Sequence, residues 1–389
     1  MKKVAVIGAS GFVGATFVER CLASDGRIEP VAVIHTTGNA WRLARHAIPL
    51  VLADALDRAS LERALAGCTH VVNCALGGRQ VMLDGLSNTL AAASAVGVKR
   101  FVHVSSIALF GELPRDRVAD ERSEARPAKG SYGWLKMKQD GIVAQAHDRG
   151  LPSVVVCPTH IFGAYSQFLG ACVNALRARR FALVEGGDLP ASFVDVENLC
   201  AAIELALDCE RPDGRAVIIE DGHGLVWRDV ANALAPVADA APPFPSLDFA
   251  RAIARARATL APPSWGGAVR RLAGHFVSPT FKDLLKSDPL LARLGESALR
   301  TARGLPPALG KPFLRAASAP APEAAAAPEF DDWSSRAQAL SVRFSTERAR
   351  TLLGYKPELS FAESMDAFAR WYRATHGQGS EEWALLRNL

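Results

Sequence analysis

Residues 6–22 read VIGASGFVGATFVERCL, and this stretch decides the fold. The apolar run Lys3 to Ile7 leads directly into three glycines, and a helical pattern follows them. Gly8 permits a tight turn, Gly11 lets backbone amides approach a pyrophosphate, and Gly14 allows the next helix to pack close to a sheet. The stretch therefore predicts the first strand, turn and helix of a dinucleotide-binding fold, although glycines also serve ordinary strand-to-helix turns.

The first half of the chain repeats this alternation of apolar runs and helical patterns. Segments with helical spacing lie at 60–66 and 86–96. Strands are expected at the short apolar runs 3–7, 31–34, 50–52, 70–74, 101–104 and 153–157. Doubly apolar strands that alternate with helices are typical of a parallel sheet covered on both faces, and such sheets bind ligands beyond the carboxyl ends of the strands. We therefore predict an α/β protein with a doubly wound parallel Rossmann sheet.

The composition excludes several other classes of protein. With 389 residues and 49% hydrophobic content, the chain can build a large core and a second lobe. Its seven cysteines have no metal-ligand spacing, which indicates buried thiols in a reducing compartment and no metal site. The start of the chain does not resemble a signal peptide, and no apolar run approaches the ~18 residues of a membrane span. The sequence thus predicts a cytoplasmic protein that acts on a small molecule and binds no nucleic acid.

A second group of residues has the chemistry of a hydride-transfer site. The run 102–111, VHVSSIALFG, carries Ser106, and the run 131–140, SYGWLKMKQD, carries Tyr132 and Lys136. The i, i+4 spacing places Tyr132 and Lys136 on one face of a helix. An unperturbed phenol has a pKa of ~10, so the ammonium, aided by a positive nicotinamide ring, is expected to lower the pKa of Tyr132. Ser106 would hold the substrate oxygen for proton transfer.

Each of these motifs also arises by chance, since a helix often carries a packing tyrosine four residues before a solvated lysine. The order in the chain favours the functional interpretation: the glycine-rich turn comes first, then the Ser-Ser strand end, then Tyr-x-x-x-Lys. In this order the motifs resemble the extended short-chain dehydrogenase/reductase superfamily, which holds NAD(P)-dependent epimerases, dehydratases and 3β-hydroxysteroid dehydrogenases. The G-x-x-G-x-x-G spacing is the form found in the extended type.

The resemblance covers about residues 1–230 and 340–375. It rests further on segments 52–76, 96–111, 154–163, 191–207 and 343–373. It implies a Rossmann domain over 1–163, a return strand and helix at about 192–220, and a substrate lobe over most of 164–389. It also implies an enzyme with NAD(P) as cofactor, and a homodimer is plausible.

The resemblance assigns cofactor contacts to particular residues. Asp54 would contact the adenine ring, Cys74 to Leu76 would line the cofactor, and the backbone after the sixth strand would meet the nicotinamide. Besides Tyr132 and Lys136, the expected cofactor-binding residues are Gly8, Ser10, Gly11, Phe12, Val13, Gly14, His35, Thr36, Arg42, Asp54, Ala55, Ala75, Pro158 and Ile161.

The choice between NAD and NADP depends on the end of the second strand. An acidic residue there would bind the ribose hydroxyls of NAD and repel a 2′-phosphate. This sequence has His35 and Thr36 at that point, with Arg42 and Arg45 shortly after. The pattern favours NADP, the alternative being that both arginines are ordinary solvated residues.

Three positions depart from the pattern of the superfamily. Cys157 stands where an arginine is usual before the proline of the sixth strand, and Met82 stands where an asparagine is often found. Ser106 is followed by Ile107 and Ala108 instead of an acidic pair, which disfavours dehydration. The first two departures remove contacts that are common in the superfamily.

The substrate lobe contains a strongly basic segment. Residues 251–315 hold twelve Lys or Arg and three Asp or Glu, a balance of +9, with amphipathic helical patterns, and an Ala/Pro linker follows at about 316–330. The segment could hold the diphosphate of a nucleotide-linked sugar or contact a membrane surface peripherally. The predicted function is hydride transfer at a hydroxyl-bearing carbon of a nucleotide-linked sugar. The alternatives are a dehydrogenase or ketoreductase of a hydrophobic alcohol or ketone, and a non-catalytic NADP-binding protein.

Overall fold

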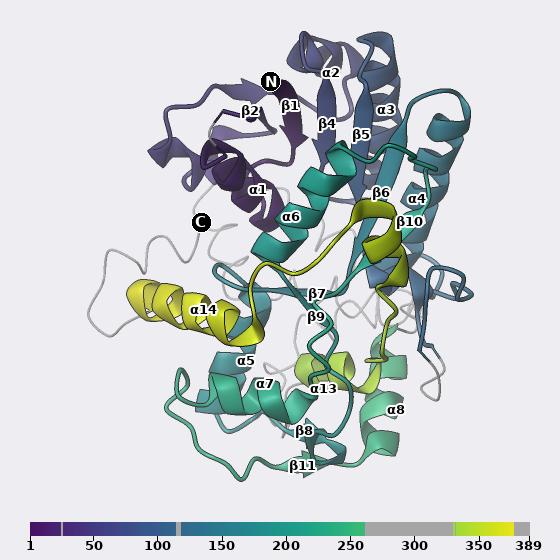
Figure 1. Ribbon diagram of the computed structural model, residues 1–389. Coiled ribbons are helices and arrows are strands. Elements are labelled where there is room, and N and C mark those ends of the chain that lie inside the picture. Colours follow the sequence, from purple (N-terminus) through teal and green to yellow (C-terminus); the bar gives the residue numbers. More distant parts are fainter. Residues whose placement is uncertain (25, 114–117, 261–329, 331, 377–389) are drawn as a thin grey trace, which may run out of the picture. The chain divides into compact units, whose positions relative to one another are not determined.

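In the computed structural model, the described part of the chain comprises residues 1–24, 26–113, 118–260, 330 and 332–376 (Figure 1). Residues 1–260 and the described residues after 329 belong to one compact unit. Most of the predicted basic segment and the Ala/Pro linker lie outside the described residues. The described start of the basic segment is helix α8 (Phe249–Leu260).

A seven-stranded sheet forms the upper half of the molecule in Figure 1, with the strand order β10-β6-β5-β4-β1-β2-β3. All of its strand pairs are parallel. The strands are β1 (Lys2–Ile7), β2 (Ile28–Ile34), β3 (Leu50–Leu52), β4 (His70–Asn73), β5 (Arg100–Val104), β6 (Ser153–Pro158) and β10 (Ala216–Ile219). The predicted doubly wound Rossmann sheet is confirmed. The order reverses direction at β1 and β4, where sheets of this kind bind dinucleotides.

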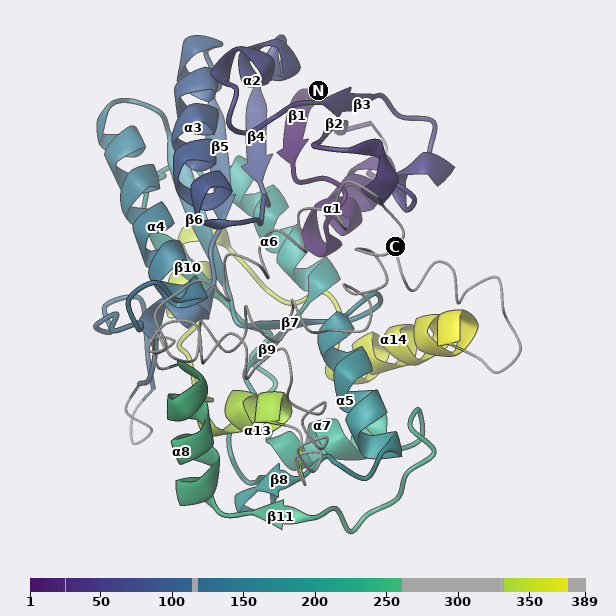
Figure 2. The same cartoon turned by 180° about the vertical axis from the view of Figure 1, so that it is seen from behind.

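Helices cover both faces of the sheet, as Figures 1 and 2 show from opposite sides. One face carries α1 (Phe12–Leu22) and α6 (Val196–Leu207), which pack against each other. The other face carries α2 (Arg58–Leu65), α3 (Leu86–Ala95) and α4 (Tyr132–Asp148). The helices expected at 60–66 and 86–96 are α2 and α3.

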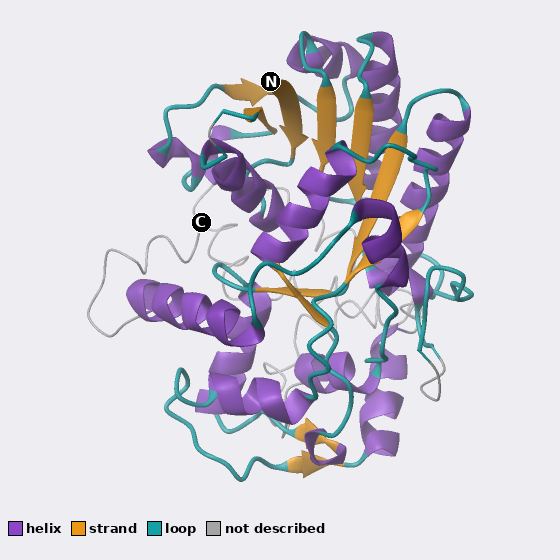
Figure 3. Cartoon of the chain, in the orientation of Figure 1, coloured by secondary structure: helices purple, strands orange, loops and turns teal. Residues whose placement is uncertain are grey.

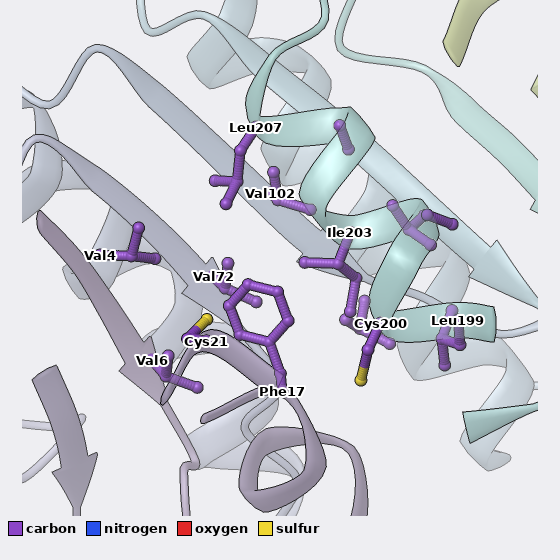
Figure 4. Close-up of a cluster of buried hydrophobic side chains, with 14 of the residues drawn as sticks. Val4, Val6, Phe17, Cys21, Val72, Val102, Leu199, Cys200, Ile203 and Leu207 are labelled. Carbon is purple, nitrogen blue, oxygen red and sulfur yellow. The ribbon is translucent and has the colours of Figure 1, made fainter. Parts of the chain in front are cut away.

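Alternation along each strand divides the core into two layers. Val4 and Val6 of β1 belong to the layer beneath α1 and α6, whereas Ala5 and Ile7 belong to the layer beneath α2, α3 and α4. Figure 4 shows the first layer, with Phe17 of α1 beside the strand valines. Because successive side chains of a strand point to opposite faces, a strand buried on both faces must be apolar throughout. This explains the continuous apolar runs of the sequence.

The remaining elements form the second lobe, which has its own hydrophobic core. Its strands pair as β7 with β9 and β8 with β11 (Figure 3). The elements are β7 (His160–Phe162), α5 (Gln167–Arg177), β8 (Leu183–Val184), β9 (Phe193–Asp195), α7 (Trp227–Leu234), β11 (Ser246–Leu247), α8, α13 (Asp332–Ala339) and α14 (Phe361–His376). Strand β9 leads into α6 and then β10, which joins the main sheet beside β6.

Hydrogen bonds attach the C-terminal part of the described chain to the Rossmann half. The Tyr355 hydroxyl donates to Asp221 Oδ1 at 3.0 Å, just beyond β10. Asn198 of α6 accepts the amides of Glu358 and Leu359 through its Oδ1, at 2.8 Å each. The C-terminal segment that resembles the superfamily therefore spans both halves of the fold.

Candidate active site

The glycine-rich turn is shaped by close contacts between backbone atoms. Gly8 has a φ of +77°, a conformation that favours glycine, and the Gly11 amide donates to the Gly8 carbonyl at 3.0 Å. A Cβ on Gly14 would lie only 2.3 Å from the Gly8 oxygen, and a Cβ on Gly8 would lie 2.9 Å from the backbone of Ala75. Gly8 and Gly14 are thus required by the fold itself, as the sequence predicted for the turn and the helix packing.

The N-terminus of α1 beyond this turn suits a dinucleotide. Gly11 is the N-cap residue, no side chain caps the helix, and its first turn contains no acid. The first amides of the helix, beginning with Phe12 and Val13, therefore point outward in a region of positive dipole potential, which favours a pyrophosphate. Ser10, Phe12 and Val13 are half-buried around this end. The amides at this helix N-terminus fit the pyrophosphate of the predicted cofactor.

The other expected cofactor residues, Arg42 excepted, also lie at or just beyond the carboxyl ends of the strands. His35 and Thr36 follow β2 and are exposed, Asp54 and Ala55 follow β3, and Ala75 follows β4. Pro158 ends β6, and Ile161 lies in β7. Because parallel strands share one carboxyl edge, these positions lie at the same end of the sheet as the glycine turn.

Arg42 has a different role from the one expected. It is only 6% exposed, its Nε donates to Glu19 at 3.0 Å and its Nη2 donates to Thr16 at 2.9 Å. A second bond joins Nη2 to Glu19, and the guanidinium lies 3.9 Å from the centre of the Tyr165 ring. The alternative of an ordinary solvated arginine is equally wrong, because the residue is buried. Arg42 attaches the loop after β2 to α1, so we no longer assign it to the cofactor.

We predict that Gly11→Val abolishes dinucleotide binding while the protein stays folded. A Cβ on Gly11 meets only the Gly8 oxygen, at 3.3 Å, so the added side chain obstructs the pyrophosphate position more than the fold. Isothermal titration calorimetry measures the binding and thermal unfolding measures the stability. Gly14→Ala is the contrasting variant, because its Cβ collides with the turn and should lower the melting temperature. Unchanged cofactor affinity in Gly11→Val would contradict the prediction.

Ser106, Tyr132 and Lys136 converge as the sequence predicted. Ser106 follows β5, Tyr132 is the first residue of α4, and the Ser106 hydroxyl is close enough to lower the pKa of Tyr132. Ser131 fixes the start of α4, because its Oγ accepts the amide of Trp134 at 3.2 Å. The buried Lys136 donates from Nζ to the Val104 carbonyl at 2.8 Å, and Nζ lies 5.8 Å from the centre of the Tyr132 ring.

The pKa values of this group differ from the expectation. Burial raises the pKa of Tyr132 to about 12, against a lowering by its hydrogen bond with Ser106, although 45% of the residue stays exposed. Burial also lowers the pKa of Lys136 to about 8. The expected lowering of the Tyr132 pKa by Lys136 is therefore not produced by the chain's own residues. At neutral pH they hold Tyr132 as a protonated phenol, which is the form that can donate a proton.

Two residues of this site were missed by the sequence analysis. A Cβ on Gly133 would lie 2.0 Å from the Ala108 carbonyl oxygen, so this glycine lets α4 pack directly on the loop that carries Ser106. Its signal was a glycine beside the tyrosine, inside a helical pattern. Asp140 lies one turn after Lys136 on the same face of α4, and the Lys-x-x-x-Asp spacing was its signal.

A cavity of about 1030 Å³ lies in the second lobe, away from these residues. It is lined by the end of α5, the connection between α7 and β11, and the end of α14, and none of the predicted site residues lines it. Among the described residues, no group of His, Cys, Asp or Glu could hold a metal ion. Within the same residues, no helix has the length and hydropathy needed to span a membrane.

The seven-stranded sheet, the glycine-rich turn and the convergent Ser106, Tyr132 and Lys136 define an enzyme of the extended short-chain dehydrogenase/reductase superfamily. Residues 4–219 match the model of the NAD dependent epimerase/dehydratase family. The match spans more than half of the chain, which therefore belongs to this family.

Similar proteins include both sugar-modifying and ketone-reducing enzymes. A 4-hydroxy-2-methyl-3-oxo-4-farnesyl-3,4-dihydroquinoline-1-oxide ketoreductase from Stigmatella aurantiaca is 27% identical over 59% of this chain and 71% of its own length. A UDP-glucose 4-epimerase from Vibrio cholerae is 24% identical over 61% of this chain and 76% of its own length. The solved structure of a nucleoside-diphosphate-sugar epimerase from Pseudomonas aeruginosa has a TM-score of 0.65 at 19% identity, covering 97% of this chain and 98% of that one. At this identity, the structural likeness shows the shared fold.

Proposed function

We propose that the protein transfers hydride to or from a hydroxyl-bearing carbon of a nucleotide-linked sugar, as an NAD(P)-dependent oxidoreductase or epimerase. The observation that carries this proposal is the grouping of Ser106, Tyr132 and the buried Lys136 after β5 and on the first turns of α4, at the carboxyl edge that also holds the glycine-rich turn. The sugar-nucleotide substrate is supported by the family and by the epimerases among the similar proteins.

Side chains of the protein itself would donate and accept the proton that moves in this reaction. A bound nicotinamide would donate or accept the hydride. Ser106 and Tyr132 would hold the substrate oxygen between their hydroxyls, and the proton would pass between Tyr132 Oη and that oxygen. In the direction of carbonyl reduction, the protonated phenol gives its proton as the carbon receives hydride. Lys136, whose ammonium is fixed at the Val104 carbonyl, would stabilise the phenolate that remains.

A hydrophobic ketone is the second candidate substrate, because aromatic side chains gather near the end of β6. His160 lies two residues after the end of β6, and the centre of its ring is 5.6 Å from the centre of the Phe168 ring. Phe168 in turn lies 4.4 Å from Trp333, which is 44% exposed. An aromatic cluster with one exposed ring suits an apolar substrate. The ketoreductase among the similar proteins supports the same alternative.

A substrate panel distinguishes the two candidates. The purified chain is mixed with nucleotide sugars or with aryl and prenylated ketones, and nicotinamide absorbance is followed in both directions. Because an epimerase regenerates its cofactor, sugar products are also analysed by chromatography. Conversion of nucleotide sugars alone supports the proposal, and conversion of ketones alone replaces it with the second candidate. Trp333→Ala should impair only ketone turnover.

We predict that NADP binds at least as tightly as NAD. His35 and Thr36 are exposed at the end of β2 and carry no negative charge to repel a 2′-phosphate, while the nearby Glu19 is paired with Arg42 and Arg45. Fluorescence titration with both reduced cofactors measures the preference, and Thr36→Asp should shift it toward NAD. A clear preference of the unaltered chain for NAD would contradict this prediction.

A further inference from the structure

Asp140 is an acidic residue beside the proposed site that the reaction above does not use. It follows Tyr132 by eight residues and Lys136 by four, so all three project from one face of α4. Its Oδ1 is covered by protein and has no hydrogen bond of regular geometry among the described residues. A covered carboxylate oxygen without a regular partner is unusual and calls for a physical reason.

Lys136 is the positively charged group on the same helix face as this carboxylate. The Lys136 ammonium is buried and its hydrogen bond goes to a neutral acceptor, the Val104 carbonyl. Burial of an ammonium without a counter-charge favours its neutral amine form. Burial lowers the pKa of Lys136, and the charge of Asp140 opposes that lowering. In return, Lys136 opposes the rise that burial imposes on the pKa of Asp140, to about 7.

The other groups around the pair supply little charge at neutral pH. Burial raises the pKa of the Cys74 thiol to about 12 and that of Cys157 well above its usual value, so both thiols stay protonated. Burial lowers the pKa of His103 of β5, which stays neutral. The charge of Glu121 also raises the pKa of Cys157.

The remaining neighbour of the carboxylate is neutral. The Ser105 hydroxyl, at the end of β5, lowers the pKa of Asp140, although its Oγ also lacks a regular hydrogen bond among the described residues. Asp140 is thus the acid on the same helix face whose charge raises the pKa of Lys136.

We propose that Asp140 is a positioning residue that keeps Lys136 protonated and directed at the Val104 carbonyl, so that an ammonium lies beneath Tyr132. The inference rests on the proposed function for its consequence, because an ammonium stabilises the Tyr132 phenolate and an amine does not. The proposed effect of the Asp140 charge on Lys136 needs neither cofactor nor substrate. It can therefore be tested separately from the reaction.

Competitive labelling with trace acetic anhydride reads the protonation of Lys136 directly. The protein is labelled between about pH 6 and pH 10, a range that spans the expected lysine titration, and acetylation is quantified for each peptide by mass spectrometry. Lys138, exposed on the same helix, is the internal reference. In Asp140→Asn the titration midpoint of Lys136 should fall by about one pH unit. Asp140→Glu should keep the original midpoint, and so should Asp148→Asn, which removes an exposed acid of α4.

An unchanged Lys136 midpoint in a folded Asp140→Asn variant overturns the inference. If that variant does not fold, Lys136→Met is added to it, because removing the unpaired ammonium should restore folding. Failure of the double variant to fold as well would also overturn the inference. A wild-type chain that binds no dinucleotide would refute the proposed function and leave the labelling result intact, so the two failures are distinguishable.

Discussion

Tyr132→Phe is expected to reduce turnover by a factor of about 10² to 10⁴, the range for losing a general acid or base. The substitution removes only the hydroxyl, which contacts Ser106 and would exchange a proton with the substrate oxygen. The ring and the position of α4 are retained, so cofactor affinity should stay within a few-fold. Steady-state rates on the substrate found in the panel measure the effect, and fluorescence titration measures the cofactor affinity.

Tyr372→Phe is the matched control for this prediction. The Tyr372 hydroxyl is bonded to Asn174 and Arg177 in the second lobe, so its removal can affect stability but not proton transfer. Equal rates in the Tyr132→Phe variant and the unaltered chain would refute the assignment of Tyr132 as the acid. Equal losses in both variants would show that the effect is not specific to the site.

Gly133→Ala is expected to have the second largest effect, a loss of turnover of about 10²-fold for a displacement of about 1 Å. The added Cβ would meet the Ala108 carbonyl oxygen at 2.0 Å and the Pro127 Cβ at 3.3 Å, and neither a backbone carbonyl nor a proline ring is a flexible group that can yield. The first turn of α4 must therefore move away from the loop of Ser106, which separates Tyr132 from its partner. Overpacking of this kind also costs about 1–3 kcal/mol of folding free energy.

Gly141→Ala is the control on the same helix. A Cβ there has no neighbour within 4 Å, so the substitution should leave turnover unchanged and raise stability by about 0.5–1 kcal/mol through helix propensity. The comparison separates the general effect of alanine in a helix from the collision at Gly133. Retention of full activity by Gly133→Ala would show that the contact with Ala108 does not position Tyr132.

The pattern of the sheet was predictable because it is local. A strand covered on both faces must be apolar at every position, and such runs are visible in the sequence without knowledge of their partners. The turn at Gly8 is local in its conformation, since a positive φ favours glycine. The i, i+4 spacing of Tyr132 and Lys136 likewise follows from helical geometry alone.

The errors concerned properties that depend on residues far apart in the chain. Arg42 carries a guanidinium, a group that can bind phosphate, but in the structure this group donates a hydrogen bond to Glu19 of α1. The pKa of Tyr132 was expected to fall through Lys136 together with a bound nicotinamide, whereas in the chain alone burial has the larger effect and raises it. Neither Glu19 nor the desolvation of the Tyr132 hydroxyl can be found by inspecting the neighbourhood of the residue in the sequence.

The sequence by itself therefore determined the fold class, the glycine-rich turn and the shared helix face of the proposed catalytic Tyr132 and Lys136, because each depends on backbone geometry or on spacing within one element. Only the tertiary structure decided that Arg42 is a structural residue, that Gly133 sets the contact between α4 and the Ser106 loop, and that burial shifts the pKa values of Lys136 and Asp140. The physical reason is that charge pairing and burial arise when separate elements pack together, and their effect depends on the local dielectric environment that packing creates.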